Sequence, residues 1–278
     1  MSPTPSPIPP IAFIGGGNMA RALIGGLLRG DALASAIHVA EPWAVNREGL
    51  AAAFGVATTP DNATAAAQAG IWVLATKPQV LREVCSALAP LAQAQRPLVL
   101  SIAAGITSAQ LDRWLGGGQT IVRAMPNTPA LLGAGVTGLF ATASTTTAQK
   151  ALAQTLLKPA GETVWLADEA LMDAVTATSG SGPAYLFALA EAMQAAAEAE
   201  GLPADAARTL VVETLAGAAR MLRESGEPAS LLRQRVTSPN GTTQAALDTL
   251  AVGGFARLVA AAIHAARIRG AELSAAHD

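Results

Sequence analysis

Three hydroxyl side chains gather around a predicted helix start late in the chain. Ser238 precedes the sequence Pro-Asn-Gly, and Thr242 and Thr243 follow it, directly before a helical pattern that begins at Gln244. The first backbone N–H groups of a helix have no partner within the helix, and the helix dipole favours negative charge there. Together with the hydroxyl groups, they would hold the carboxylate of a small acid. Because Ser and Thr are also common caps, simple capping is the alternative interpretation.

A glycine-rich turn near the other end of the sequence predicts a binding site for a dinucleotide. It follows the apolar run at residues 11–14 and precedes a helical pattern at residues 18–29. Gly15 would allow the tight turn, Gly17 would let the backbone approach a pyrophosphate, and Ala20 would permit close packing of the helix on the strand. The cofactor-binding residues predicted in this turn are Gly15, Gly17, Asn18 and Met19.

An acidic residue follows the second predicted strand. Glu41 lies about twenty residues beyond the glycines, where a carboxylate would bond the ribose 2′-hydroxyl of NADH. Asn46 and Arg47 lie a few residues further on and could instead bind the 2′-phosphate of NADPH. Glu41 could also be no more than a solvated strand end. The sequence therefore leaves the choice of dinucleotide open.

Three further turns with polar residues, glycine or proline follow predicted strands. In an open parallel sheet, ligands bind beyond the carboxyl ends of the strands. These turns would therefore surround the nicotinamide ribose, although each of them alone could be an ordinary loop. The residues predicted to contact the cofactor there are Ala75, Lys77, Pro78, Ala103, Met125 and Asn127.

The elements that must position these residues divide the chain into two predicted domains. Alternating strands and helices at residues 11–167 predict an α/β domain with a doubly wound parallel sheet of the Rossmann type. Its predicted strands span residues 11–14, 37–40, 71–75, 98–101, 120–123, 136–140 and 163–166. Residues 168–278 carry only helical patterns and predict an all-α domain for substrate binding and dimerisation. Residues 1–10, rich in Pro and Ser, predict a disordered tail and no signal peptide.

Composition argues against several classes of protein. A net charge of -2 with 14% charged residues gives no basic face for a nucleic acid. Gly, Pro or charged residues interrupt every apolar run, so we expect a soluble protein without a membrane partner. The only cysteine, Cys85, cannot form an intrachain disulfide, which fits a cytoplasmic location. We expect no bound metal.

In their order along the chain, these motifs resemble those of pyrroline-5-carboxylate reductases. The resemblance also includes residues 179–185, and it extends from residue 11 to about residue 273. Residues 236–243 are its specific part, whereas many dehydrogenases share the glycine turn. Asn240 stands where the family usually has a second Gly. Asn is the non-glycine residue that best tolerates a left-handed backbone, so we expect the turn to persist.

The resemblance implies hydride transfer from NADPH or NADH to the C=N bond of 1-pyrroline-5-carboxylate, which gives L-proline. It also implies a homodimer that assembles into a homodecamer, and it places Asn62 at the adenosine ribose. Gly182 and Pro183 open a helix that would form a wall of the substrate site near the nicotinamide, or alternatively a hinge between domains. The residues expected to hold the substrate carboxylate are Ser238, Gly241, Thr242 and Thr243, with Thr243 as the catalytic hydroxyl nearest the ring nitrogen.

The predicted helical domain contains no lysine, and the reduction of a cyclic imine is compatible with this absence. A protonated imine carries its own positive charge, so the protein needs mainly to position the reactants. A β-hydroxyacid dehydrogenase would need a proton-transfer residue, typically a lysine from the helical half. The lysines are Lys77, Lys150 and Lys158, all before that half, which disfavours this alternative. A reductase of another cyclic imino acid and a non-catalytic NAD(P)-binding protein stay open as alternatives.

Overall fold

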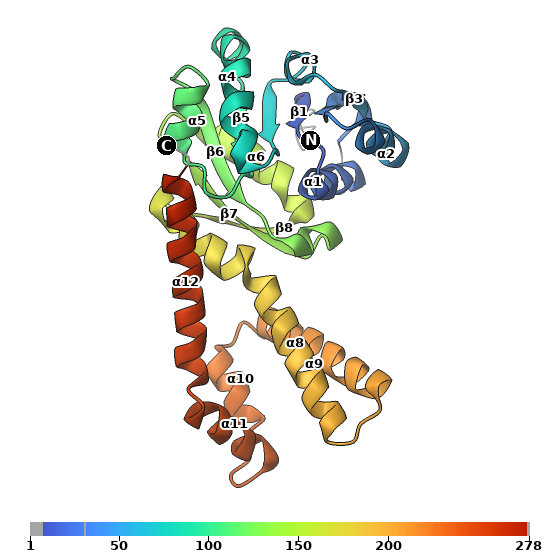
Figure 1. The fold of residues 1–278 in the computed structure, drawn as a ribbon, viewed down its shortest axis with the longest axis vertical. Helices are drawn as coiled ribbons and strands as arrows, with labels where there is room; N and C mark the ends of the chain where they lie inside the picture. The colour runs from blue at the N-terminus through green and yellow to red at the C-terminus, as the bar shows by residue number, and fades with distance from the viewer. Residues whose placement is uncertain (1–7, 31, 277–278) are drawn as a thin grey trace, which may run out of the picture. The chain divides into compact units, whose positions relative to one another are not determined.

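The structure is a computed structural model that describes residues 8–30 and 32–276 (Figure 1). Two compact units make up the chain: residues 1–181 together with 266–278, and residues 182–265. Most of the predicted disordered tail, residues 1–7, lies outside the described residues. The predicted domain boundary after residue 167 stays a prediction.

The first unit is built on one eight-stranded sheet. Its strands are β1 (Ile11–Ile14), β2 (Ile37–Ala40), β3 (Ala57–Thr59), β4 (Ile71–Leu74), β5 (Leu98–Ser101), β6 (Thr120–Met125), β7 (Gly135–Ala141) and β8 (Gly161–Trp165). They are arranged in the order β3-β2-β1-β4-β5-β6-β7-β8. The six strands from β3 to β6 are parallel, in the order typical of a doubly wound dinucleotide-binding sheet. The predicted fold class is confirmed.

Two features of the sheet differ from the sequence-based prediction. The short strand β3 was not predicted, because three residues with a single apolar side chain give no strand pattern. Strand β7 runs antiparallel to β6, although parallel units were predicted throughout. The connection at residues 126–134 is too short for a parallel crossover, which needs a dozen or more residues.

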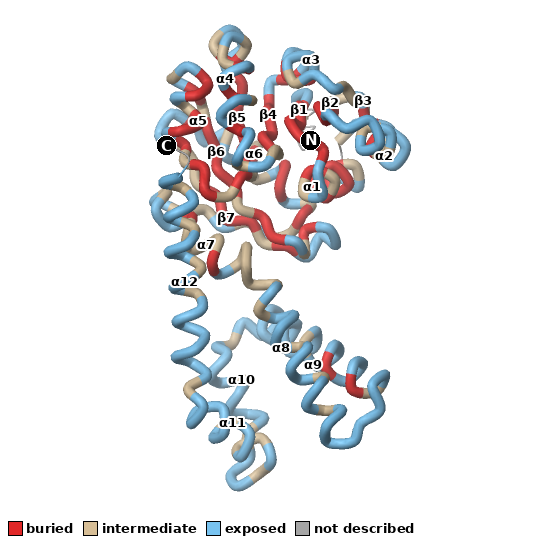
Figure 2. Tube along the Cα trace, viewed as in Figure 1, coloured by how far each residue is buried: buried red, intermediate tan, exposed pale blue. Residues whose placement is uncertain are grey.

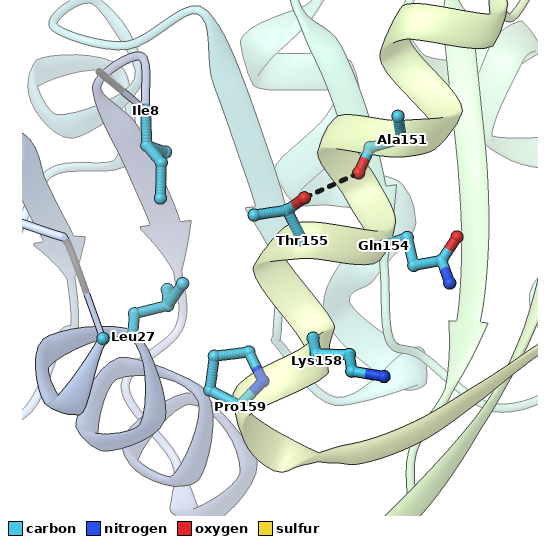
Figure 3. Close-up of a pocket in the computed structure, with 8 residues that line it drawn as sticks. Ile8, Leu27, Ala151, Gln154, Thr155, Lys158 and Pro159 are labelled. Atoms are coloured by element: carbon cyan, nitrogen blue, oxygen red, sulfur yellow. Dashed lines mark hydrogen bonds between the residues drawn. The ribbon is translucent and has the colours of Figure 1, made fainter. Parts of the chain in front are cut away.

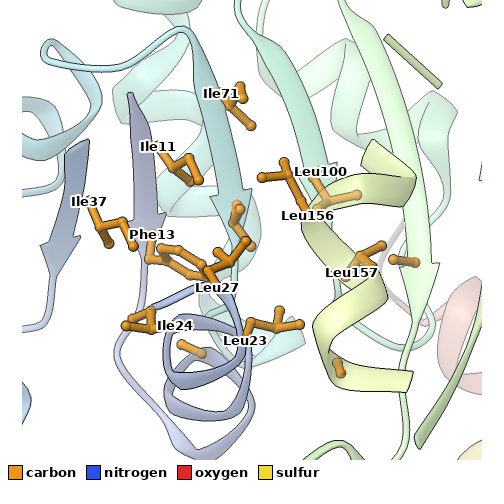
Figure 4. Packing of buried hydrophobic residues seen from close by; sticks show 14 of the residues in the cluster. Ile11, Phe13, Leu23, Ile24, Leu27, Ile37, Ile71, Leu100, Leu156 and Leu157 are labelled. Atoms are coloured by element: carbon orange, nitrogen blue, oxygen red, sulfur yellow. The ribbon is translucent and has the colours of Figure 1, made fainter. Parts of the chain in front are cut away.

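Helices cover both faces of the sheet. Consecutive side chains of a strand point to opposite faces, so each strand contributes to a hydrophobic cluster on either side. Ile11 and Phe13 pack into one cluster with residues of α1 and α6, as Figure 4 shows, whereas Ala12 and Ile14 pack into a second cluster with residues of α4 and α5. The helices of this unit are α1 (Asn18–Arg29), α2 (Ala44–Phe54), α3 (Asn62–Ala66), α4 (Pro78–Gln95), α5 (Ser108–Trp114), α6 (Thr147–Leu157) and α7 (Met172–Val175). The unit also contains a 3₁₀ turn (Thr128–Leu132) and a π-helical turn (Thr176–Gly180).

The second unit is helical, as predicted. Its helices are α8 (Gly182–Ala199), α9 (Ala204–Ser225), α10 (Ala229–Arg235), α11 (Thr242–Val252) and the first part of α12 (Phe255–Ala275). Of residues 182–265, all of which the structure describes, only Ala207 and Val211 are buried (Figure 2). This unit therefore has almost no core of its own.

Within the described part of the chain, no single helix has the length and apolar character needed to cross a membrane. Helices α11 and α12 meet that criterion only as a pair, and the pair is bent by 52°.

Candidate functional site

The predicted cofactor residues follow six neighbouring strands of the sheet. Because those strands are parallel, their carboxyl ends lie at one edge, with the glycine turn after β1 and the Ala75 turn after β4. Strands β1 and β4 are neighbours in the sheet. The strand order continues from β1 to β2 and β3 on one side, and from β4 to β5 and β6 on the other. In open α/β sheets, ligands bind at the point where the order reverses in this way. The fold thus brings the predicted dinucleotide residues to one edge. Their contacts with a cofactor stay predictions.

The glycine turn has the geometry that its sequence predicts. Gly15 has φ +106°, and a Cβ atom there would lie 2.7 Å from the Ala75 carbonyl oxygen, so only glycine fits. Gly17 is exposed, and a Cβ atom built on it would meet no atom within 4 Å. Gly17 is the N-cap of α1, and no side chain of the described residues caps this helix. The first N–H groups of α1, including those of Asn18 and Met19, are therefore open to an anion.

Glu41 is buried at the end of β2, so it is not the solvated strand end that the sequence also allowed. One carboxylate oxygen, Oε2, accepts a hydrogen bond from the Gly16 N–H (3.0 Å). The other, Oε1, accepts from the Trp43 N–H (3.1 Å) and from the Asn46 side chain (3.3 Å). The carboxylate is thus fixed against the glycine turn.

Asn62 begins α3, beside the end of β3. The N-cap Asp61 accepts hydrogen bonds from the hydroxyl and the backbone N–H of Thr64 at 2.6 and 2.7 Å. These bonds, that of the hydroxyl first, lower the pKa of the Asp61 carboxyl below its ordinary value. Asn62 itself is half-buried, at the same edge as Glu41.

The turn after β4 lies directly against the glycine turn. Thr76 follows Ala75 here, and its backbone nitrogen would lie 3.0 Å from a Cβ atom on Gly15. The Thr76 hydroxyl oxygen is buried and has no hydrogen-bond partner among the described residues. Lys77 is exposed as the N-cap of α4, and Pro78 is its first residue. An open glycine backbone and an unpaired buried hydroxyl fit a site that is completed by a ligand.

The turns after β5 and β6 are held in place by buried polar contacts. Ala103 is buried, and its N–H donates to the Ser101 hydroxyl (3.4 Å). Asn127 accepts a bond from the Val136 N–H (3.0 Å) and donates to the Ser179 carbonyl (3.1 Å). Its amide therefore ties the loop after β6 to β7 and to the π-helical turn.

Met125, at the end of β6, packs against that π-helical turn. A Cβ atom on Gly180 would lie 2.6 Å from the methyl group of Met125. The turn closes with a bond from the Ser181 N–H to the Thr176 carbonyl (2.8 Å), which spans five residues. Such π turns occur often at functional sites. The sequence analysis predicted only helical patterns in this region, because periodicity does not distinguish a π turn from an α-helix.

A buried ion pair that sequence reasoning missed supports this edge. The Arg123 guanidinium on β6 donates to Glu169 Oε1 (2.7 Å), and Arg123 is almost fully buried. Glu169 also accepts bonds from the backbone N–H and the hydroxyl of Ser108 at the start of α5. The pair therefore joins β6, α5 and the segment after β8. Residues this far apart in sequence carry no local pattern that links them.

The hydroxyl cluster at residues 238–243 lies at the start of α11, in the second unit. Asn240 has φ +58°, which confirms that Asn occupies a left-handed turn. Gly241 is the N-cap of α11, and no side chain of the described residues caps this helix. Ser238 and Thr242 are exposed and Thr243 is half-buried. None of the three hydroxyl residues is the N-cap of α11, and their role in binding stays a prediction.

Gly182 and Pro183 open α8, also in the second unit. Both are half-buried, and a Cβ atom on Gly182 would meet no atom within 4 Å. The structure thus groups the predicted residues in two sets, with the cofactor residues in the first unit and the substrate residues in the second. Nothing beyond this grouping tests their roles, which stay predictions.

A cavity of about 460 Å³ elsewhere in the first unit is not this site (Figure 3). It is lined in part by Ile8, which precedes β1, and by Leu27 and Gly30 at the end of α1. These residues lie at the amino ends of the strands, opposite the glycine turn. Among the described residues, no cluster of His, Cys, Asp or Glu is suited to hold a metal ion.

The strand order, the glycine turn and the uncapped start of α1 define a dinucleotide-binding protein of the Rossmann class. Two family models match the chain. One, described as pyrroline-5-carboxylate reductase dimerisation, matches residues 169–273, and the other, described as NADP oxidoreductase coenzyme F420-dependent, matches residues 10–105.

Similar proteins extend over almost the whole chain. The pyrroline-5-carboxylate reductase of Pseudomonas aeruginosa is 48% identical over 266 residues, which cover 96% of this chain and 97% of the relative. The structure of the Coxiella burnetii pyrroline-5-carboxylate reductase aligns with a TM-score of 0.92 at 41% identity, covering 96% of this chain and 99% of that one. The Plasmodium falciparum pyrroline carboxylate reductase with NADP bound aligns at 0.85 with 26% identity, covering 95% and 97%. The chain belongs to the pyrroline-5-carboxylate reductase family.

Proposed function

We propose that the protein is an NAD(P)H-dependent oxidoreductase that reduces the C=N bond of 1-pyrroline-5-carboxylate to give L-proline, the last step of proline biosynthesis. The observation that carries this function is the near full-length identity of 48% to a pyrroline-5-carboxylate reductase. The strand order of the sheet and the open, hydroxyl-bearing start of α11 support this proposal, because the reaction needs one site for a dinucleotide and one for a small acid.

In this mechanism, the chain positions the reactants and supplies no strong acid. The N–H groups at the start of α11 and the hydroxyls of Ser238, Thr242 and Thr243 hold the substrate carboxylate. Thr243 places its hydroxyl beside the ring nitrogen, and Gly182 and Pro183 form a wall of the substrate site. When bound, the reduced nicotinamide supplies the hydride that the imine carbon accepts. The protonated imine already carries the charge that attracts this hydride.

The first unit binds the dinucleotide through its exposed backbone. N–H groups at Gly17, Asn18 and Met19 hold the pyrophosphate at the start of α1. Glu41 and Asn62 contact the adenosine ribose. The remaining contacts come from the turns after β4, β5 and β6, at Ala75, Lys77, Pro78, Ala103, Met125 and Asn127. Residues 168–278 form the substrate-binding and dimerisation domain in this scheme.

We further propose a homodimer that assembles into a homodecamer in the cytoplasm. The match of residues 169–273 to a dimerisation model and the nearly coreless second unit support association. A single buried cysteine, which excludes an intrachain disulfide, supports a reducing compartment.

Thr243→Val tests the substrate site, because the change replaces a hydroxyl by a methyl group of similar volume. Loss of a bond to a charged substrate should lower kcat/KM for pyrroline-5-carboxylate by roughly 10- to 100-fold. Kinetics followed by the absorbance of the reduced nicotinamide measure this effect, and the affinity for the dinucleotide should stay unchanged.

Thr249→Val is the matched control, since Thr249 lies on the same helix and its hydroxyl bonds only the Ala245 carbonyl (3.0 Å). Its kinetics should stay near those of the wild type. Wild-type kinetics in Thr243→Val would remove Thr243 from the site. Faster turnover of the six-membered homologue of the substrate would favour a reductase of another cyclic imino acid.

A further inference from the structure

The first turn of α5 carries a capping box with a bond that reaches almost to the end of the chain. Gln110 Oε1 accepts from the backbone N–H and the hydroxyl of Thr107 at 2.8 and 3.1 Å, and the Thr107 hydroxyl accepts from the Gln110 N–H (3.2 Å). Gln110 Nε2 donates to the Ser274 carbonyl oxygen in the last turn of α12 (3.2 Å), 164 residues further along. Gln110 is only 2% exposed. One buried amide thus caps α5 with its oxygen and holds α12 with its nitrogen.

A second capping box shows which part of the amide the cap itself needs. Thr146 and Gln149 form the same box at the start of α6, with bonds of 2.9, 3.0 and 3.2 Å. Among the described residues, the Gln149 side chain bonds Thr146 alone. A capping box uses only an acceptor oxygen at this position, which glutamate supplies as well as glutamine. The amide nitrogen of Gln110 is therefore not needed to cap α5, and its distinct contact is the one with α12.

The end of α12 packs on the turn between β5 and α5. Residues 266–278 belong to the first unit, and the last turns of α12 lie beside α5 (Figure 1). Gly105 in this turn is buried and has φ +72°. A Cβ atom on Gly105 would lie 3.6 Å from the Leu273 Cβ atom and from the Ser274 backbone nitrogen. The end of α12 therefore contacts the turn at residues 102–106 directly, besides holding it through the amide.

A second tie joins the same turn of α5 to the segment after β8. The Ser108 N–H and hydroxyl both donate to the Glu169 carboxylate. Residues 169–273 are the stretch that matches the dimerisation model. Glu169 begins this stretch and Ser274 follows its last residue, so both of its ends are bound to one helical turn. That turn comes directly after the loop with Ala103, which the proposed function places at the cofactor.

We propose that Gln110 is a positioning residue for the dinucleotide site. Its amide nitrogen holds the end of α12 on the turn at residues 102–106, and this contact sets the backbone conformation in which Ala103 receives the dinucleotide. The inference rests on the proposed function, which gives this turn its ligand. Neither Gln110 nor α12 contacts the dinucleotide in this scheme. Because coupling between two parts of a protein is reciprocal, a bound dinucleotide also stabilises the end of α12.

Gln110→Glu breaks the bond to α12 and keeps the cap. The carboxylate still accepts the bonds from Thr107, but it has no donor for the Ser274 carbonyl oxygen. We expect the KM for the reduced dinucleotide to rise about fivefold or more, with the KM for pyrroline-5-carboxylate unchanged. Gln149→Glu makes the same exchange in the second box and should keep both wild-type values. A lower melting temperature with a wild-type KM for the dinucleotide would mean that Gln110 has only a structural role and would overturn the inference.

Shortening the chain tests the same contact with Gln110 left in place. A chain that ends at Glu272 lacks Leu273 and the Ser274 carbonyl, so its KM for the dinucleotide should rise as in Gln110→Glu. A chain that ends at Ala276 keeps both and is the matched control. A wild-type KM in the shorter chain would overturn the inference, and this comparison still decides if Gln110→Glu does not fold.

Hydrogen exchange of the unmodified protein tests the reciprocal effect. Saturation with NADPH or NADH, whichever binds more tightly, should slow exchange of the backbone amides at residues 268–276 about fivefold or more. Exchange in α6, which carries the second capping box, should not change. An unchanged end of α12 in a protein that binds the dinucleotide would contradict the inference and leave the proposed function intact. A wild-type protein that binds neither dinucleotide would instead contradict the proposed function.

Discussion

The Arg123–Glu169 ion pair is a buried contact that joins β6 to the segment after β8. Arg123 is only 7% exposed and Glu169 is 24% exposed, so neither charge is well solvated. Glu169→Gln leaves the buried guanidinium without a counter-charge, and we expect it to lower the free energy of unfolding by about 3 kcal/mol, the low end for a buried pair because Glu169 is partly exposed. Chemical unfolding at a fixed protein concentration measures this change.

A double-mutant cycle with Arg123→Met separates the pair from its surroundings. Once Arg123 is replaced by an apolar side chain, the loss of the Glu169 charge leaves no buried cation without a counter-charge. The double variant should therefore lose clearly less stability than the sum of the two single changes. Additive losses would mean that the two side chains do not act as a pair.

Helix α4 carries the only thiol of the chain, and that thiol is buried. Cys85 is fully buried in the cluster that covers one face of the sheet, and burial raises the pKa of its thiol to about 12. We expect a thiol reagent at about pH 8 to label no cysteine in the native protein and one per chain in denaturant. Ser86→Cys places a thiol at the next, exposed position of the same helix and should be labelled without denaturant.

The same shift sets the direction of a pH dependence. The folded state holds the Cys85 proton more tightly than the unfolded state, whose thiol titrates near the ordinary value of 9.0. The stabilisation from this group is complete below that value and is lost as the pH rises toward about 12. Labelling of native Cys85 at the rate of an exposed thiol would contradict the burial of this side chain against the sheet.

The sequence predicted elements well where a local pattern determines them. Helix α1 was predicted at residues 18–29, its observed bounds, because a glycine turn precedes it and an apolar stripe runs through it. Strand β3 and the antiparallel direction of β7 were missed, since they depend on pairing with a neighbour. The predicted strands at residues 120–123 and 136–140 leave 12 residues between them, which is long enough for a parallel crossover, so the spacing in the sequence did not reveal the direction of β7.

For the candidate site, the sequence indicated the turns but not the partners of their side chains. Glu41 was located by its distance from the glycines, whereas its bonds to Gly16 and Asn46 depend on where α2 packs. The buried amide of Asn127 could not be foreseen for the same reason, because its partners lie on β7 and in the π-helical turn. Three-dimensional packing decides which polar groups remain available for a ligand.

The second unit buries almost none of its side chains. Only Ala207 and Val211 are buried in it, and large apolar side chains such as Phe187 (67% exposed) and Leu258 (69%) face outward. Apolar surface of this extent marks a protein–protein interface. We expect the protein to sediment well above its chain mass of 27.9 kDa, and Leu258→Glu to shift it toward smaller species.

Leu132→Glu is the matched control for this change. Leu132 is 86% exposed but belongs to the 3₁₀ turn of the first unit, so the same new charge there should leave the assembly intact. Light scattering coupled to gel filtration compares the three proteins at one concentration. Since the helices of the second unit bury little against each other, dissociation should also lower their melting temperature. A wild-type monomer, or equal dissociation in both variants, would show that the apolar surface of the second unit does not drive association.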